Sequence, residues 1–173
     1  MDRAITNSII RFILLWTLQV FILRQFVWGW GGQIYLQVHA YPLFILLLPL
    51  RTSRLLVLTL AFALGLAIDW FSETLGMHAA ALVFTAFLRA PILAVLEPRE
   101  KYALNAAPTK VSQNDAWFFR YAGLLMLAHL FFYFSVEAFT FVYLKAIVLK
   151  TIVSWVASMG FILALVYIFN PKA

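Results

Sequence analysis

The sequence predicts an all-α, polytopic membrane protein with six transmembrane helices in a single domain covering residues 1–173. Two observations predict this class: 65% of the residues are hydrophobic while only 12% are charged, and the mean hydropathy is +0.94. Such a chain has too little polar side-chain surface to cover a water-soluble globule. At about 20–25 residues per span and short turns, a chain of this length holds five to seven helices and no separate soluble domain.

Six apolar runs are expected to form the spans. The first is expected to be an uncleaved span, because no small-residue cleavage site follows it. Pro42 and Pro49 are expected to shape the second, and Pro91 to bend the fourth. The long polar segment after the fourth run is expected to be a loop in water. The expected spans cover residues 7–28, 34–50, 55–71, 75–96, 116–136 and 147–169, and the loop covers residues 97–115.

Lysine and arginine lie singly at the ends of the apolar runs and indicate the orientation of the chain. With the N-terminus in the cytoplasm, ten of the 13 Lys and Arg residues lie inside and three lie outside. Cytoplasmic loops carry such an excess, so both termini and the 97–115 loop are expected in the cytoplasm. The net charge of +6 then reflects topology and contact with the anionic headgroups of the lipid bilayer, rather than binding to nucleic acid. The three outside residues are Arg24, Lys145 and Lys150.

The sequence lacks the side-chain sets of common catalytic and metal sites. It has no cysteine, which excludes disulfides, thiolate metal sites and a cysteine nucleophile, and its three histidines are His39, His78 and His129. We find no H-E-x-x-H, G-x-S-x-G or P-loop motif. We therefore expect no catalytic residues, no cofactor and no metal, and we expect that the protein is not an enzyme.

Two carboxylates, Asp69 and Glu73, lie in an otherwise apolar region. An ionised carboxylate is costly in hydrocarbon, so this region is either a wet turn or a functional site inside the membrane. We favour the wet turn, with Ser72 or Thr74 capping the fourth span. The alternative is an intramembrane carboxylate that anchors a partner or binds a cation.

Small side chains precede Asp69 at intervals of four residues, at Ala61 and Gly65. Stripes of small residues let membrane helices approach closely. The fourth span has a similar stripe after Gly76. We favour tight internal packing of the third and fourth spans, and the second interpretation is contact with the helix of another protein through Ala61, Gly65, Asp69 and Gly76.

A polar stripe, His129, Tyr133 and Glu137, runs along the fifth span. We favour an interfacial position for these residues over a proton relay, and we also expect His78 at the membrane interface rather than as a ligand.

The predicted orientation places two acidic and two basic residues together on the outer side of the membrane. We expect ion pairs there between Asp69 or Glu73 and Lys145 or Lys150, because all four lie at the outer ends of the third and sixth spans.

Residues 41–93 resemble the MreD family of bacterial rod shape-determining membrane proteins. The resemblance lies in Pro42, which opens a leucine-rich span, and in Gly65, Asp69 and Gly76, which follow a G-x₃-D-x₆-G pattern. Glu73 departs from the pattern as an additional acid. Outside residues 41–93 the resemblance is limited to length, hydropathy and the six-span arrangement.

The resemblance implies a non-enzymatic scaffold of the cell-wall elongation machinery in the bacterial inner membrane. Its implied partners are a bitopic MreC-like protein and, indirectly, MreB-like filaments and peptidoglycan synthases. It also implies a fold similar to the S-components of energy-coupling-factor transporters. The alternative function is therefore a small-molecule or lipid carrier with a cavity among the same helices.

Overall fold

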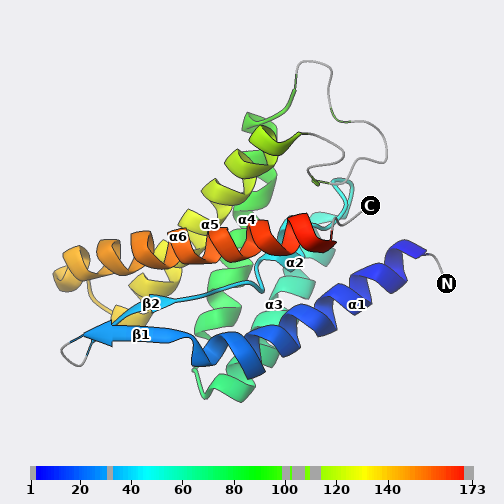
Figure 1. The fold of residues 1–173 in the computed structure, drawn as a ribbon. Helices are drawn as coiled ribbons and strands as arrows, with labels where there is room; N and C mark the ends of the chain where they lie inside the picture. The colour runs from blue at the N-terminus through cyan, green and yellow to red at the C-terminus, as the bar shows by residue number, and fades with distance from the viewer. Residues whose placement is uncertain (1–2, 31–32, 99–101, 103–107, 110–113, 170–173) are drawn as a thin grey trace.

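The computed structural model describes residues 3–30, 33–98, 102, 108–109 and 114–169, and it is mostly helical (Figure 1). Within these residues, five helical segments are long and apolar enough to cross a membrane, as expected for a multi-pass membrane protein. They are Thr6–Gln25, Arg54–Ser72, Met77–Val95, Asp115–Ala138 and Leu144–Phe169. These five segments confirm five of the six predicted spans, and most of the predicted 97–115 loop lies outside the described residues.

The N-terminal span changes its helical form before it ends. Helix α1 (Arg3–Thr17) continues into the π-helix η1 (Leu18–Ile22) and the 3₁₀-helix η2 (Leu23–Gln25). Strands β1 (Val27–Trp30) and β2 (Gln33–Gln37) then form an antiparallel hairpin with a bulge between Trp28 and Gly29. A π-helix inside a span often marks a functional or structural requirement, and here it contains the buried Gln19.

The predicted second span, residues 34–50, is not a helix. The segment consists of strand β2, an irregular stretch and the four-residue helix α2 (Leu43–Leu46), and residues 39–48 are all buried. Pro42 immediately precedes α2 and Pro49 follows it, so neither proline lies inside a long helix. Irregular backbone is tolerated at membrane depth only where protein surrounds it, and the helices here enclose this segment. Its high hydropathy reflects burial in protein rather than contact with lipid.

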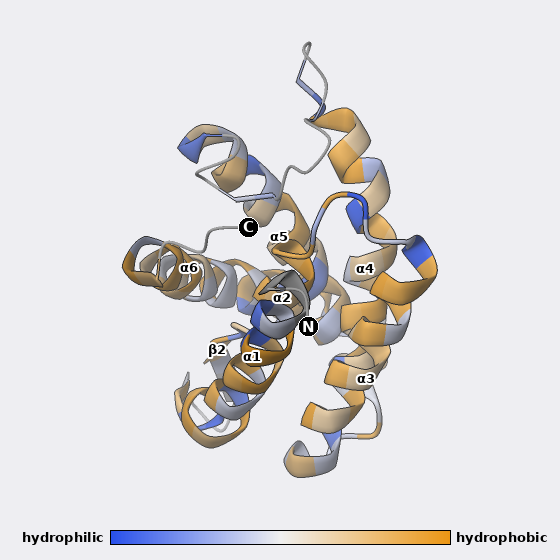
Figure 2. Ribbon diagram, turned by 90° about the vertical axis from the view of Figure 1, so that its right-hand side faces the viewer, coloured by the Kyte–Doolittle hydropathy of each residue, from blue (hydrophilic) through white to orange (hydrophobic). Residues whose placement is uncertain are grey.

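The remaining helices form the body of the molecule. Helix α3 (Arg54–Ser72) packs on α4 (Met77–Val95), which packs on α5 (Asp115–Ala138); the 3₁₀-helix η3 (Phe141–Tyr143) leads to α6 (Leu144–Phe169), which packs on α5 and β2. Pro91 lies inside α4. Hydrophobic residues predominate along the long helices in Figure 2, and many large hydrophobic side chains on these helices are exposed. The span in α5 is the most buried of the five and the span beginning in α1 is the least buried.

Candidate functional site

The turn between α3 and α4 is organised around the Asp69 carboxylate. Only 3% of Asp69 is exposed. Its Oδ1 accepts hydrogen bonds from the His78 backbone N–H at 3.0 Å and from the Thr74 hydroxyl, and its Oδ2 accepts one from the Ala79 backbone N–H at 2.9 Å. The His78 Nδ1 lies 2.9 Å from Oδ1. The prediction of a wet turn is therefore wrong for Asp69, because its carboxylate is enclosed and bonded by the chain itself, whereas Glu73 is exposed at the same turn.

Asp69 performs the capping role that the N-terminus of α4 otherwise lacks. The N-cap residue, Gly76, has no side chain, and its positive φ of 83° is favourable for glycine. The first backbone N–H groups of a helix need hydrogen-bond acceptors, and the N-terminal end of a helix favours a nearby negative charge. The carboxylate of Asp69, near the end of α3, supplies the acceptors and the negative charge for α4. We predicted that Ser72 or Thr74 would cap this helix, whereas the cap comes from the preceding helix.

The small-residue stripe packs inside the protein. Ala61 and Gly65 are buried, and a Cβ added to Gly65 would collide with backbone atoms of Ala79 and His78 in α4. This confirms the internal-packing interpretation. The alternative, contact with a partner helix, is wrong for Gly65 and Asp69, because α4 already occupies their face, and Ala61 is fully buried. Contact of a partner helix with Gly76, at the start of α4, stays a prediction.

All three histidines of the chain meet beside this turn. The ring centroid of His39 lies 5.9 Å from that of His78 and 5.8 Å from that of His129. The rings of Tyr41 and Tyr133 complete the cluster, at 5.6 Å and 5.0 Å from His78. We refer to these five side chains, all buried, as the histidine–tyrosine cluster. The structure buries His78, His129 and Tyr133 inside the protein, and their depth relative to the membrane surface stays a prediction.

Hydrogen bonds connect this cluster across three elements. The Tyr41 hydroxyl lies 2.8 Å from His129 Nε2, and the Thr85 hydroxyl lies 2.8 Å from His129 Nδ1. His39 Nε2 contacts Gln37 Oε1 at 3.4 Å, whereas His39 Nδ1 has no hydrogen-bond partner among the described residues. Most of the imidazole nitrogens described here are therefore already engaged. Within the described residues, no group of three or more histidine, cysteine or acidic residues has the geometry to hold a metal ion.

Side chains from neighbouring helices satisfy the irregular backbone that carries His39. The Gln19 amide in η1 donates to the Val38 carbonyl at 3.1 Å and accepts from the Ala40 N–H at 2.9 Å. On α6, Ser158 accepts from the His39 N–H at 2.9 Å and Ser154 accepts from the Gln37 N–H at 3.0 Å. Our sequence interpretation missed these residues. The signal was a glutamine, Gln19, inside the first apolar run and two serines spaced by four in the last.

Arg89 performs a similar function at the other end of the buried segment. Its guanidinium donates to the carbonyls of Leu48 and Pro49 and to the Tyr121 hydroxyl, and the side chain is buried. The structure directs Arg89 inward, where it satisfies the carbonyls that follow α2.

The ion pairs in the structure differ from those predicted for the outer side of the membrane. Lys150 pairs with Glu137 at 3.1 Å, and both side chains are partly exposed. Asp69 is bonded to His78 instead of a lysine. Among the described residues, neither Glu73 nor Lys145 forms an ion pair, so the predicted pairing of Asp69 or Glu73 with Lys145 or Lys150 is wrong. Helices α3 and α6 are separated by α4 and α5, which the hydropathy pattern could not reveal.

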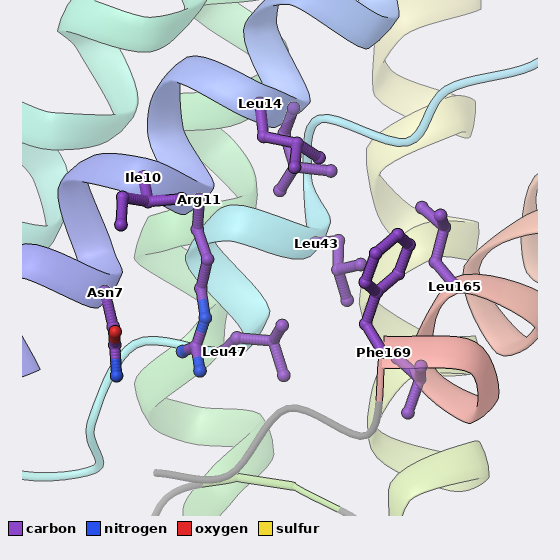
Figure 3. A pocket seen from close by; sticks show the side chains of 10 residues that line it. Asn7, Ile10, Arg11, Leu14, Leu43, Leu47, Leu165 and Phe169 are labelled. Carbon is purple, nitrogen blue, oxygen red and sulfur yellow. The ribbon is translucent and has the colours of Figure 1, made fainter.

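Two grooves border α1. The first, of about 610 Å³, lies between α1, α2 and α6 and is shown in Figure 3. The second, of about 370 Å³, lies between α1, α2 and α3. Phe12 of α1 packs edge-on against Phe44 of α2, with 5.3 Å between ring centroids. Apart from Asn7 and Arg11 in the first groove, and Ser8 and Thr52 in the second, the lining residues are apolar.

No protein-family model, no curated protein and no solved structure matches the chain. The resemblance of residues 41–93 to MreD stays a prediction, and the two grooves and the buried polar cluster are the features from which a function is proposed below.

Proposed function

We propose that this chain is a multi-pass membrane scaffold that binds the transmembrane helix of a one-span partner protein. The observation that carries the proposal is the groove between α1 and α3. Its lining contains no charged side chain among the described residues, and it opens beside the least buried span of the molecule. Its lining residues are Ser8, Ile9, Phe12, Phe44, Leu48, Pro49, Thr52, Leu56 and Leu60.

Packing is the reason why such a groove suits a helix. Lipid tails are as apolar as leucine, so helices associate in a bilayer through close packing and hydrogen bonds rather than through the hydrophobic effect. A concave apolar surface lets the side chains of a partner helix interdigitate.

The resemblance to MreD supplies the proposed biological setting. In this setting the partner is a bitopic MreC-like protein, and the scaffold supports cell-wall elongation together with MreB-like filaments and peptidoglycan synthases. The proposed location is the bacterial inner membrane with both termini in the cytoplasm. The proposed contact differs from the one expected from the sequence, because the stripe of Ala61 and Gly65 is covered by α4.

A matched pair of substitutions on α3 tests the scaffold. Leu56 and Leu66 are 49% and 47% exposed, but only Leu56 lines the groove. Leu56→Trp should fill the groove and lower the recovery of the co-purified one-span protein about tenfold, which corresponds to about 1.4 kcal/mol of binding free energy. Leu66→Trp should retain the partner. In a bacterium that lacks its own MreD, Leu66→Trp should restore rod shape, whereas Leu56→Trp should not.

Two results would contradict the proposal. One is equal loss of the partner in both variants, which would indicate a general effect of the bulky residue. The other is the absence of any stoichiometric one-span protein after gentle detergent extraction of the wild type.

A second candidate function is a small-molecule or lipid carrier. The groove between α1 and α6 favours it, because its volume of about 610 Å³ lies in the range of ligand pockets and it contains the polar side chains of Asn7 and Arg11. Identification of a retained metabolite, in place of a one-span protein, in the same extract would favour the carrier.

A further inference from the structure

We propose that the groove between α1, α2 and α6 binds an anionic glycerophospholipid, with Arg11 donating to its phosphate and the apolar lining holding an acyl chain. This inference deepens the carrier candidate, whose groove it uses, and it is independent of the proposed scaffold, because a scaffold can also hold a resident lipid. The groove is open to the surroundings of the protein and is lined by three separate elements.

The lining is polar at one end and apolar elsewhere. Asn7 and Arg11 lie one turn apart on α1, and Figure 3 shows both side chains on the same side of the groove. None of the described lining residues is acidic. The apolar remainder comes from Ile10, Leu14, Leu15, Leu43, Leu47, Leu165, Val166 and Phe169. A ligand that matches this lining has one anionic group joined to a long apolar chain.

The depth of Arg11 agrees with the position of a lipid phosphate. Arg11 lies five residues inside the span Thr6–Gln25, or about 7.5 Å along the helix axis. Helical side chains tilt toward the N-terminus, and a long arginine side chain extends further in that direction toward the membrane surface. From Asn7 to Leu14 the groove follows about 10 Å of helix. This is within the half-thickness of the hydrocarbon core, so an acyl chain from the same leaflet can occupy it.

Charge distinguishes a lipid from a partner helix as the occupant. An apolar helix placed over this groove would bury the Arg11 guanidinium further among apolar side chains, which is costly for a charged group. A phospholipid instead presents a phosphate to the guanidinium. A guanidinium has five N–H donors, so Arg11 can keep its existing contact within the protein and also donate to a phosphate.

Native mass spectrometry of the full-length protein tests the site. The probes are phosphatidylglycerol and phosphatidylcholine with identical acyl chains, added to the detergent-purified chain. Phosphatidylglycerol should be retained preferentially, and Arg11→Gln should lower that preference about fivefold, the contribution of one arginine near a membrane surface. Arg11→Lys should keep most of the preference. Arg51→Gln is the charge control, because Arg51 is exposed and does not line the groove.

A second pair of variants tests the apolar part. Ile10 and Ile13 are each 55% exposed on α1, but only Ile10 lines the groove. Ile10→Trp should reduce lipid retention, whereas Ile13→Trp should leave it unchanged.

Equal retention of the two lipids by the wild type, or an unchanged preference in Arg11→Gln, would overturn the proposal, as would equal effects of the two tryptophan variants. Inorganic phosphate that binds as strongly as the lipid would show that an anion alone is recognised. If Arg11→Gln retains the one-span partner of the proposed scaffold while it loses lipid preference, the two proposals are separated.

Discussion

The α3–α4 turn and the groove beside α1 both place an ionisable side chain among apolar residues, but the two side chains differ in their surroundings. At the turn, Asp69 is buried and accepts hydrogen bonds from three neighbouring residues of the chain. Beside α1, Arg11 lines a groove of about 610 Å³. Removing a buried charge that holds several internal hydrogen bonds destabilises a fold, whereas a partly exposed charge at the edge of a groove is also within reach of a ligand. Substitutions in the turn should therefore lower stability, and substitutions in the groove should change binding.

The largest effect on stability is expected at Gly65. Gly65→Ala places a Cβ against the backbone of α4, so the two helices must separate, at a cost of about 3 kcal/mol. Unfolding in mixed micelles with increasing dodecyl sulfate, followed by circular dichroism, measures this cost. Gly160→Ala on α6 is the control, because an added Cβ there meets no atom within 4 Å. A wild-type midpoint for Gly65→Ala would contradict the close approach of α3 and α4.

Asp69→Asn should have the next largest effect. The asparagine amide keeps one oxygen acceptor, but its NH₂ group is a donor and faces the N–H groups of α4. Hydrogen bonds to a charged group contribute about 2 kcal/mol. The same unfolding assay should therefore show a loss of about 2 kcal/mol. Glu73→Gln is the matched control, because Glu73 is exposed at the same turn. Equal midpoints for the two variants would indicate that Asp69 only contacts water.

A smaller loss of stability is expected at the histidine–tyrosine cluster. Tyr41→Phe removes the hydroxyl 2.8 Å from His129 Nε2 and leaves a buried nitrogen without a partner, at a cost of about 1 kcal/mol. The exposed Tyr143 provides the control, Tyr143→Phe, which should unfold as the wild type does. If Tyr41→Phe matched that control, the Tyr41–His129 contact would contribute nothing to the fold.

The smallest effect is expected at the Lys150–Glu137 pair. Both side chains are partly exposed, and ion pairs of this kind contribute about 0–1 kcal/mol. Glu137→Gln should therefore shift the unfolding midpoint by less than any of the three substitutions above, and added salt should reduce the difference further. A loss as large as that of Asp69→Asn would show that the pair is shielded from solvent.

The five helical spans could be predicted from the sequence, but the arrangement of the site could not. Hydropathy identifies apolar runs, and runs such as residues 55–71 and 147–169 coincide closely with α3 and α6. The same measure assigned residues 34–50 to a span, because burial in protein and burial in lipid favour the same side chains. The spacing of Ala61, Gly65 and Asp69 correctly indicated a close helix contact. The spacing could not identify α4 as the neighbour that excludes any other helix.

By itself, therefore, the sequence determined the class of protein, the five long helices and the close-contact stripe on α3, because these depend on local composition and helical periodicity. Only the tertiary structure decided that residues 39–48 form a buried irregular segment, that Asp69 caps α4, and that His39, His78 and His129 meet. It also decided where the two grooves lie. These features join residues far apart in the chain, and their energies come from packing and hydrogen bonds that form only when the helices assemble.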